Sequence, residues 1–115
     1  MKKRFRLRRQ GDFQRVLRSR RLFAGRTLVA FARPGEGEGL RVGVAVTRQI
    51  RGAVARNRAR RRLREAVRER LLGDWGEDGR GIGYDVVLIA RLAALTEPQA
   101  SLEREVGAVR RLLES

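Results

Sequence analysis

Residues 53–72 read AVARNRARRRLREAVRERLL, a helix-forming stretch in a chain of 115 residues. Its apolar side chains recur at spacings of three and four residues, which places them on one helix face: Ala59, Leu63, Ala66, Val67 and Leu71. Arginine fills most other positions, with eight arginines against two glutamates. The stretch therefore predicts an amphipathic helix with a buried apolar stripe and a strongly cationic outer surface.

The segments on either side of this helix are predicted to be strands. Residues 41–48 (RVGVAVTR) alternate, with Val42, Val44 and Val46 on one face. Residues 84–90 (YDVVLIA) have almost no polar face, as expected for a strand covered on both sides. A strand, a helix of about 20 residues and a second strand together predict a βαβ crossover.

The sequence before residue 41 predicts a third strand. Residues 27–33 (TLVAFAR) alternate weakly, and the glycine-rich segment 34–39 that follows them is a predicted turn. We therefore expect residues 27–33 and 41–48 to pair as an antiparallel hairpin. Gly43 and Ala45 have little or no side chain, so another element can approach this face of the second strand closely. This favours a packed helix there and also permits a ligand groove.

Both ends of the chain predict helices. Phe13, Val16 and Leu17 share one face of a short helix near the start. Near the end, Thr96 and Gln99 have the spacing of a capping box that opens a C-terminal helix. The predicted order is α-β-β-α-β-α, which indicates an α+β fold: a two-layer α-β sandwich of helices on a mixed sheet, with residues 1–115 forming a single domain.

Composition points to a polyanionic partner. The chain carries 28 Lys and Arg against 13 Asp and Glu, a formal net charge of +15, and only Lys2 and Lys3 are lysines. Such a surplus is typical of nucleic-acid-binding domains, and the arginine fork suits phosphate. Cysteine and histidine are absent, so disulfides, thiolate metal sites and imidazole catalysis are excluded. We expect no catalytic residue, no metal site, no membrane span and a cytoplasmic protein.

On the predicted helix, positions four apart on one face are about 6 Å apart, comparable with the spacing of phosphates along a single strand. Two adjacent rows result: Arg56, Arg60, Arg64 and Arg68 form one, and Asn57, Arg61, Arg64 and Arg68 form the other. Asn57 stands out among arginines because its amide both donates and accepts. It either caps the helix start or contacts RNA sugar or phosphate.

The string AVARNRARRRLRE resembles the RNR signature of the bacterial ribonuclease P protein component family. The opening RFRLRRQGDFQRVLR resembles the start of that family, RVGVAVTR the strand before its signature, and YDVVLIAR the strand after it. The resemblance therefore covers nearly the whole chain, and the signature is specific because these three segments flank it in this order.

The resemblance implies the protein subunit of an endoribonuclease that removes 5′ leaders from precursor tRNA. Its partners would be a catalytic RNA, bound 1:1, and the leader; Mg²⁺ would belong to the RNA holoenzyme, and the protein alone would hold no cofactor. The signature helix would lie near the catalytic core of the RNA, through Arg56, Asn57, Arg58, Arg60, Arg61 and Arg64. A cleft would bind the single-stranded leader, through Phe13, Leu17, Phe31, Thr47 and Arg48. The family fold is an α-β sandwich whose βαβ connection is left-handed.

The chain departs from the family pattern at two places beside the implied cleft. The family commonly has an aromatic residue at the position of Leu17, and two lysines where this chain has Arg48 and Gln49. Base stacking at residue 17 is therefore lost. One cation is missing at residue 49, and one is gained at Arg51, before the signature, where family members often have glycine.

Two other function classes fit parts of the sequence. The main alternative is a structural RNA-binding protein, similar to a ribosomal protein, without a role in processing. A metal-dependent nuclease would need converging carboxylates, but the acids cluster in predicted loops: Glu36, Glu38, Asp74, Glu77 and Asp78. No helix-turn-helix or zinc pattern supports a transcription factor.

Overall fold

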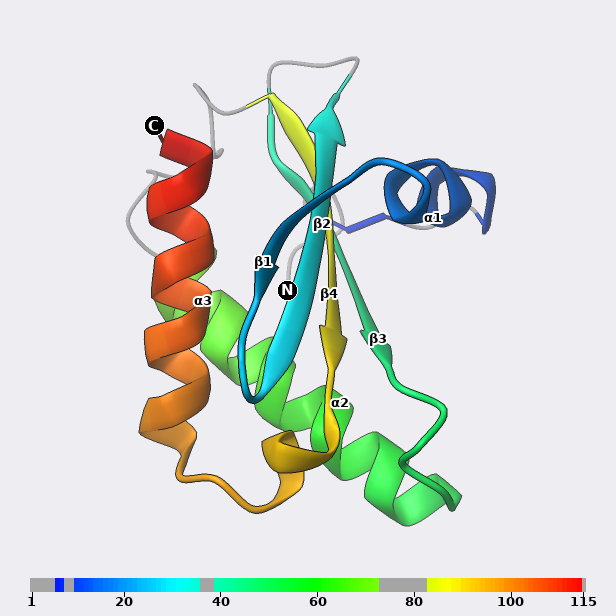
Figure 1. The fold of residues 1–115 in the computed structure, drawn as a ribbon, viewed down its shortest axis with the longest axis vertical. Helices are drawn as coiled ribbons and strands as arrows, with labels where there is room; N and C mark the ends of the chain where they lie inside the picture. Colours follow the sequence, from blue (N-terminus) through cyan, green and yellow to red (C-terminus); the bar gives the residue numbers. More distant parts are fainter. Residues whose placement is uncertain (1–5, 8–9, 36–38, 73–82, 115) are drawn as a thin grey trace.

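Four strands form one mixed sheet in the order β1-β2-β4-β3 in the computed structural model, which describes residues 6–7, 10–35, 39–72 and 83–114 (Figure 1). The elements are α1 (Gln10–Leu17), β1 (Arg20–Ala24), β2 (Leu28–Pro34), β3 (Arg41–Val46), α2 (Ala53–Val67) with its π-helical continuation η2 (Arg68–Leu72), β4 (Tyr84–Ala90), the 3-10 turn η3 (Leu92–Leu95) and α3 (Gln99–Glu114). The α+β class is confirmed.

The parallel pairing of β3 with β4 confirms the predicted βαβ crossover. Val42 lies opposite Val86 and Val46 opposite Ala90, while α2 forms the connection between the two strands. Parallel neighbours cannot be joined by a tight turn, so the chain between them must cross a face of the sheet. The basic helix α2 therefore packs on the sheet because it lies in this crossing connection.

The predicted hairpin between residues 27–33 and 41–48 is wrong. Strand β4 lies between β2 and β3 and pairs with both, antiparallel to β2 and parallel to β3. The physical reason is the composition of β4, whose Val86, Val87 and Leu88 are all fully buried. Only a central position covers both faces of such a strand and satisfies both its edges.

Strand β1 was not predicted, so the order α-β-β-α-β-α lacks one element. Its sequence RRLFA begins with two arginines and shows no clear alternation. It pairs only with β2, and the register shifts between Arg21 and Phe23. An edge strand with a bulge carries little apolar periodicity, which explains why the pattern did not reveal it.

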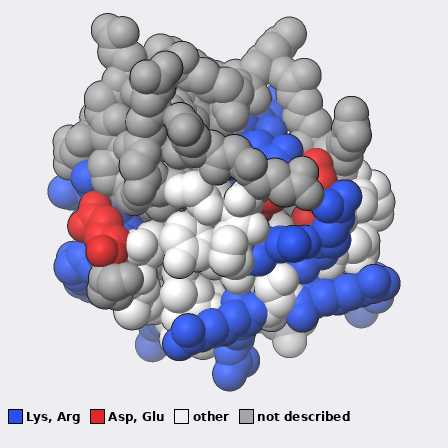
Figure 2. Space-filling view, turned by 90° about the horizontal axis from the view of Figure 1, so that it is seen from above, with Lys and Arg blue, Asp and Glu red and all other residues white. Residues whose placement is uncertain are grey.

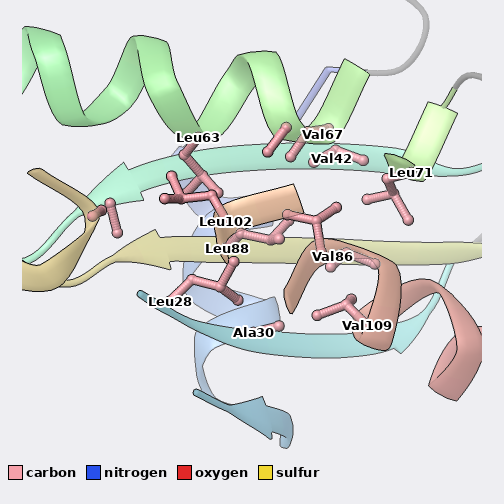
Figure 3. Close-up of a cluster of buried hydrophobic side chains, with 14 of the residues drawn as sticks. Leu28, Ala30, Val42, Leu63, Val67, Leu71, Val86, Leu88, Leu102 and Val109 are labelled. Carbon is pink, nitrogen blue, oxygen red and sulfur yellow. The ribbon is translucent and has the colours of Figure 1, made fainter. Parts of the chain in front are cut away.

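Helices α2 and α3 cover one face of the sheet and enclose the main core (Figure 3). All five residues of the predicted stripe on α2 are fully buried, as expected: Ala59, Leu63, Ala66, Val67 and Leu71. Each buried leucine or valine contributes about 1.5–3 kcal/mol relative to exposure. This layer of helices on a sheet is the predicted α-β sandwich, and within the described ranges no helix has the length and apolar character needed to span a bilayer.

The predicted capping box at the start of α3 is wrong. Thr96 ends the η3 turn, and α3 begins at Gln99 after Pro98. The Gln99 side chain instead exchanges two hydrogen bonds with Arg62, accepting from Nε at 3.1 Å and donating to the backbone oxygen at 2.8 Å. The Gln99 side chain, which the local pattern predicted to cap the helix, thus forms a tertiary contact between α2 and α3.

The short helix α1 packs on the opposite face, where Val16 and Leu7 form a second small cluster with Val87. Gly43 permits this contact, because a methyl group at residue 43 would be 2.5 Å from the nearest ring carbon of Phe13. Of the two explanations for the small residues on this face of β3, a packed helix or a ligand groove, the packed helix is therefore confirmed at Gly43.

We predict that Gly43→Ala lowers the free energy of unfolding by about 1–3 kcal/mol, because the Phe13 ring must move in a packed site. Gly107→Ala is the matched control on α3, where the nearest atom to the new methyl group is Arg111 Nη1 at 3.8 Å. That variant should gain about 0.5–1 kcal/mol from helix propensity. Urea unfolding measures both, and equal stability of the two variants would contradict this packing.

Candidate nucleic-acid interface

The outer surface of α2 carries a groove of about 600 Å³ lined almost entirely by charged side chains: Asn57, Arg60, Arg61, Arg64, Glu65 and Arg68. These residues are spaced three and four apart, so the helix period brings them onto one face, opposite the buried stripe. Four guanidinium groups and one carboxylate border the groove, which gives it a net positive charge. We call this surface the arginine ladder.

Asn57 belongs to the ladder and does not cap the helix. Gly52 is the N-cap residue, with φ of 88°, and it provides no side-chain cap. Asn57 lies further along and accepts a hydrogen bond on Oδ1 from Arg60 Nη1 at 2.9 Å. The capping interpretation is therefore wrong, and the amide holds one guanidinium group in place at the start of the groove.

Arg64 lies close to two other cationic groups. Partial burial lowers its pKa, as do the nearby charges of Arg6 and Arg60. Arg6 comes from the start of the chain, where it bridges to Val42 while Leu7 N donates to Val42 O at 2.9 Å. Apart from a basic N-terminal segment, no sequence pattern predicted that Arg6 approaches Arg64. Three like charges at one place favour an anionic ligand such as phosphate.

Arg68 lies at the other end of the ladder and is compensated within the protein. It pairs with Glu65 through a hydrogen bond and with Glu69 at 3.4 Å. The bond to Glu65 and the two carboxylate charges raise its pKa. The exposed cationic part of the ladder is therefore centred on Arg60, Arg61 and Arg64.

Arg56 and Arg58 do not line this groove. Arg58 is exposed outside it. Arg56 is half-buried, and its guanidinium group donates to the backbone oxygens of Thr47 and Ile50 at 3.0 Å each. The expected row of Arg56, Arg60, Arg64 and Arg68 is thus corrected, because its first member points into the protein.

A second cavity, of about 470 Å³, opens on the face of the sheet that carries α1, and we call it the sheet cavity. Its floor is apolar and its rim is polar: the lining residues are Ala24, Val29, Phe31 and Ile89, with Arg21, Thr47, Gln49 and Arg91. Register explains the floor, since Val29 pairs with Ile89 and Ala45 lies on the other side of Ile89. Helix α1 covers only the neighbouring part of this face.

The residues that were expected to form one cleft line two depressions, and Phe13, Leu17 and Phe31 pack against the same small buried cluster. Phe31 and Thr47 line the sheet cavity, whereas Phe13 and Leu17 line a separate depression of about 320 Å³ with Gln10 and Gln14. Arg48 is exposed and lines neither. These depressions occupy the same face of the sheet.

Several residues that line the sheet cavity were not predicted from the sequence. Val29 and Ile89 could have been found from strand alternation, because they share a face with Phe31. Arg21 and Arg91 gave no distinct signal in a chain so rich in arginine. Arg91 is held by its Nη1, which donates to Gly25 O at 2.7 Å. Two rim cations thus come from segments 70 residues apart, from 21 to 91, that only the tertiary fold brings together.

An ion network fixes α1 against the sheet next to these depressions. Arg41 on β3 binds both carboxylate oxygens of the buried Asp85, at 3.0 and 2.8 Å. Another nitrogen of Arg41 lies 3.6 Å from Asp12 Oδ2 on α1. A buried carboxylate needs such bidentate pairing to offset its desolvation. The network orients the helix that carries Phe13 and Leu17.

Neither surface contains a set of metal ligands. Among the described residues, no cluster of three or more Asp, Glu, His or Cys side chains could hold a metal ion. The five loop acids considered for a nuclease lie outside the described residues. Viewed from above in Figure 2, arginine side chains lie at the left, lower and right-hand edges of the described surface around an uncharged central patch. The described chemistry is that of binding anions.

Comparison with known proteins agrees with this geometry. A family model described as Ribonuclease P matches residues 1–114. The ribonuclease P protein component of Dehalococcoides mccartyi is 41% identical over 106 residues, which cover 92% of this chain and 82% of that protein. The ribonuclease P protein component of Symbiobacterium thermophilum is 44% identical over 107 residues, covering 92% and 88%.

A solved structure shows the same fold. The RNase P protein of Staphylococcus aureus has a TM-score of 0.72 to this chain at 22% identity, with 94% of each chain covered. Family model, relatives and fold therefore agree over almost the whole length. The chain belongs to the ribonuclease P protein component family.

Proposed function

We propose that this protein assists a catalytic RNA in removing the 5′ leader of precursor tRNA, with the two polyanions bound on different surfaces. The arginine ladder binds the catalytic RNA, and the sheet cavity with the depression beside α1 binds the leader. One observation carries the proposal: a groove with a net positive charge and a cavity with an apolar floor and cationic rim lie on opposite sides of one sheet.

The ladder suits a folded RNA backbone. Arg60, Arg61 and Arg64 repeat along the helix axis at a spacing comparable with that of phosphates. Neutralising phosphates releases condensed counterions, so each contact contributes roughly −0.7 to −0.9 to the slope of log affinity against log salt. Such contacts carry little sequence information, which fits a subunit that recognises one RNA by shape and charge.

The sheet cavity suits a single strand. An unstacked base can lie against the Phe31 ring and the neighbouring apolar side chains, while Arg21 and Arg91 meet phosphates at the rim. A duplex keeps its bases stacked and cannot use the apolar floor. Selectivity for a substrate with a single-stranded leader over mature tRNA follows from this difference.

We assign bond cleavage, and the Mg²⁺ that it needs, to the RNA subunit. The protein screens repulsion between the catalytic RNA and its substrate, which lowers the magnesium concentration required. We propose one protein per RNA, because the described residues present one arginine ladder to a partner. In this division of labour the protein is a subunit of an endoribonuclease and is not itself the catalyst.

The direct test is reconstitution with a bacterial catalytic RNA at low magnesium. We expect 5′ maturation of a precursor tRNA at a magnesium concentration at which neither component alone is active, and tighter binding of precursor than of mature tRNA. Equal affinity for the two tRNAs would instead fit a structural RNA-binding protein. Cleavage by the protein without RNA would support a nuclease and contradict the proposal.

We predict that Arg61→Ala weakens binding to the catalytic RNA and makes the salt slope shallower by roughly 0.7–0.9, the share of one phosphate. Arg104→Ala on α3 is the matched control, because it removes the same charge from an exposed site outside both surfaces. The affinity of each variant for the catalytic RNA, measured between low and moderate salt, gives the two salt slopes. Equal changes of the salt slope in both variants would show that the ladder has no special role.

We predict opposite effects of two substitutions at Gln49, an exposed residue on the cavity rim. Gln49→Lys adds a cation beside the leader and should tighten precursor binding by about two- to fivefold, the scale of an exposed ion pair. Gln49→Glu should weaken it by a similar factor. Mature tRNA serves as the control ligand and should respond little. Changes of the same sign in both variants would rule out this path for the leader.

A further inference from the structure

Arg56, the first arginine of the RNR triplet, is committed to contacts inside the protein. Its Nη1 donates to Thr47 O and to Ile50 O at 3.0 Å each, and its Nη2 lies 3.3 Å from Val46 O. A guanidinium fork can satisfy three carbonyl oxygens at once, which a lysine ammonium cannot do with the same geometry. This arginine therefore closes a clamp on the backbone that precedes it.

The clamped backbone joins the two proposed RNA surfaces. Residues 46–52 lead from the end of β3 to the start of α2. Thr47 N donates to Ala90 O at 2.9 Å, which ties the segment to β4, and Ile50 N donates to Thr47 O at 3.2 Å. Thr47 and Gln49 form part of the wall of the sheet cavity. Arg56 thus holds the cavity wall and the beginning of the ladder helix in one arrangement.

The location of Arg56 in the helix supports this role. It lies in the first turn of α2, where a positive charge is disfavoured by the helix dipole and where no acidic residue is present. The three carbonyl oxygens offset that disadvantage, and they occupy three of the five N–H donors of the guanidinium group. The ladder residues Arg60 and Arg61, one turn further on, are free of this commitment to the 46–50 backbone.

We propose that Arg56 is a positioning residue that couples the leader cavity to the ladder, and that it does not contact RNA. The proposal rests on the assignment of these two surfaces to leader and catalytic RNA. Loss of the clamp should loosen the 47–52 segment and disorganise the cavity wall, while the cations of the ladder remain available.

The first test uses the protein alone, so its outcome is independent of the proposed function. Hydrogen exchange followed by mass spectrometry should show that Arg56→Ala speeds exchange of residues 47–52 by about tenfold or more, with the core strands unchanged. Arg61→Ala is the control and should exchange like the unmodified protein. Unchanged exchange of residues 47–52 in Arg56→Ala would overturn the clamp.

The second test uses the reconstituted holoenzyme. For Arg56→Ala we expect the salt slope of binding to the catalytic RNA to stay the same, while the preference for precursor over mature tRNA falls by about fivefold or more, since one cavity wall is lost. If Arg56 were a phosphate ligand, the slope would instead become shallower by roughly 0.7–0.9, as in Arg61→Ala. That result would overturn the proposal.

Arg56→Lys separates charge from geometry, and it replaces Arg56→Ala if the latter does not fold. It keeps the positive charge and should restore only part of the preference for precursor, because one ammonium group cannot hold all three oxygens. Full restoration by lysine would show that charge alone matters and would overturn the proposal. If the unmodified holoenzyme has no preference for precursor, the proposed function fails, and the exchange experiment still decides whether the clamp exists.

Discussion

The parallel pairing of β3 with β4 is the constraint on which the rest of the structure depends. Because two parallel neighbours cannot be joined by a turn, the chain crosses the sheet, and the crossing helix must bury one stripe and expose the other. In α2 the buried stripe is aliphatic and the exposed stripe is arginine. The same pairing brings the end of β3 next to the end of β4, where the sheet cavity opens. One topological choice therefore places the ladder and the cavity at the two sides of a short connecting segment.

Arginines with identical chemistry serve different purposes in this fold. Arg56 and Arg62 donate to backbone oxygens and join elements to one another. Arg68 is balanced by two glutamates. Arg60 and Arg61 remain at the solvent-exposed groove, which leaves the binding surface smaller and better defined than the arginine count implies. Partition of this kind reduces the like-charge repulsion that a helix with eight arginines would otherwise meet.

Sequence periodicity predicted the buried faces of helices and strands, whereas strand order and the partners of individual arginines depend on tertiary contacts. The stripe of α2 and the crossover were predictable because 3.6-residue and 2-residue patterns report directly on buried faces. Strand order was not, since the hairpin expectation rested on adjacency in sequence, whereas β4 took the central place that its two apolar faces require. In the candidate site, Asn57 and Arg61 were predictable from helix geometry, and Phe31 and Thr47 from the family resemblance. The inward orientation of Arg56 and the placement of Arg21 and Arg91 at one cavity could not be predicted, because no pattern distinguishes one arginine from another until the fold supplies its partners.

The most direct test of the division into two RNA surfaces uses the absence of cysteine, which lets a single introduced thiol carry a photo-crosslinker at a unique place. Asn57→Cys places the probe on the ladder and Gln49→Cys places it on the rim of the sheet cavity. In a holoenzyme bound to precursor tRNA, the ladder probe should crosslink to the catalytic RNA and the rim probe to the 5′ leader. Crosslinks of both probes to the same RNA, or with the two targets exchanged, would contradict the account.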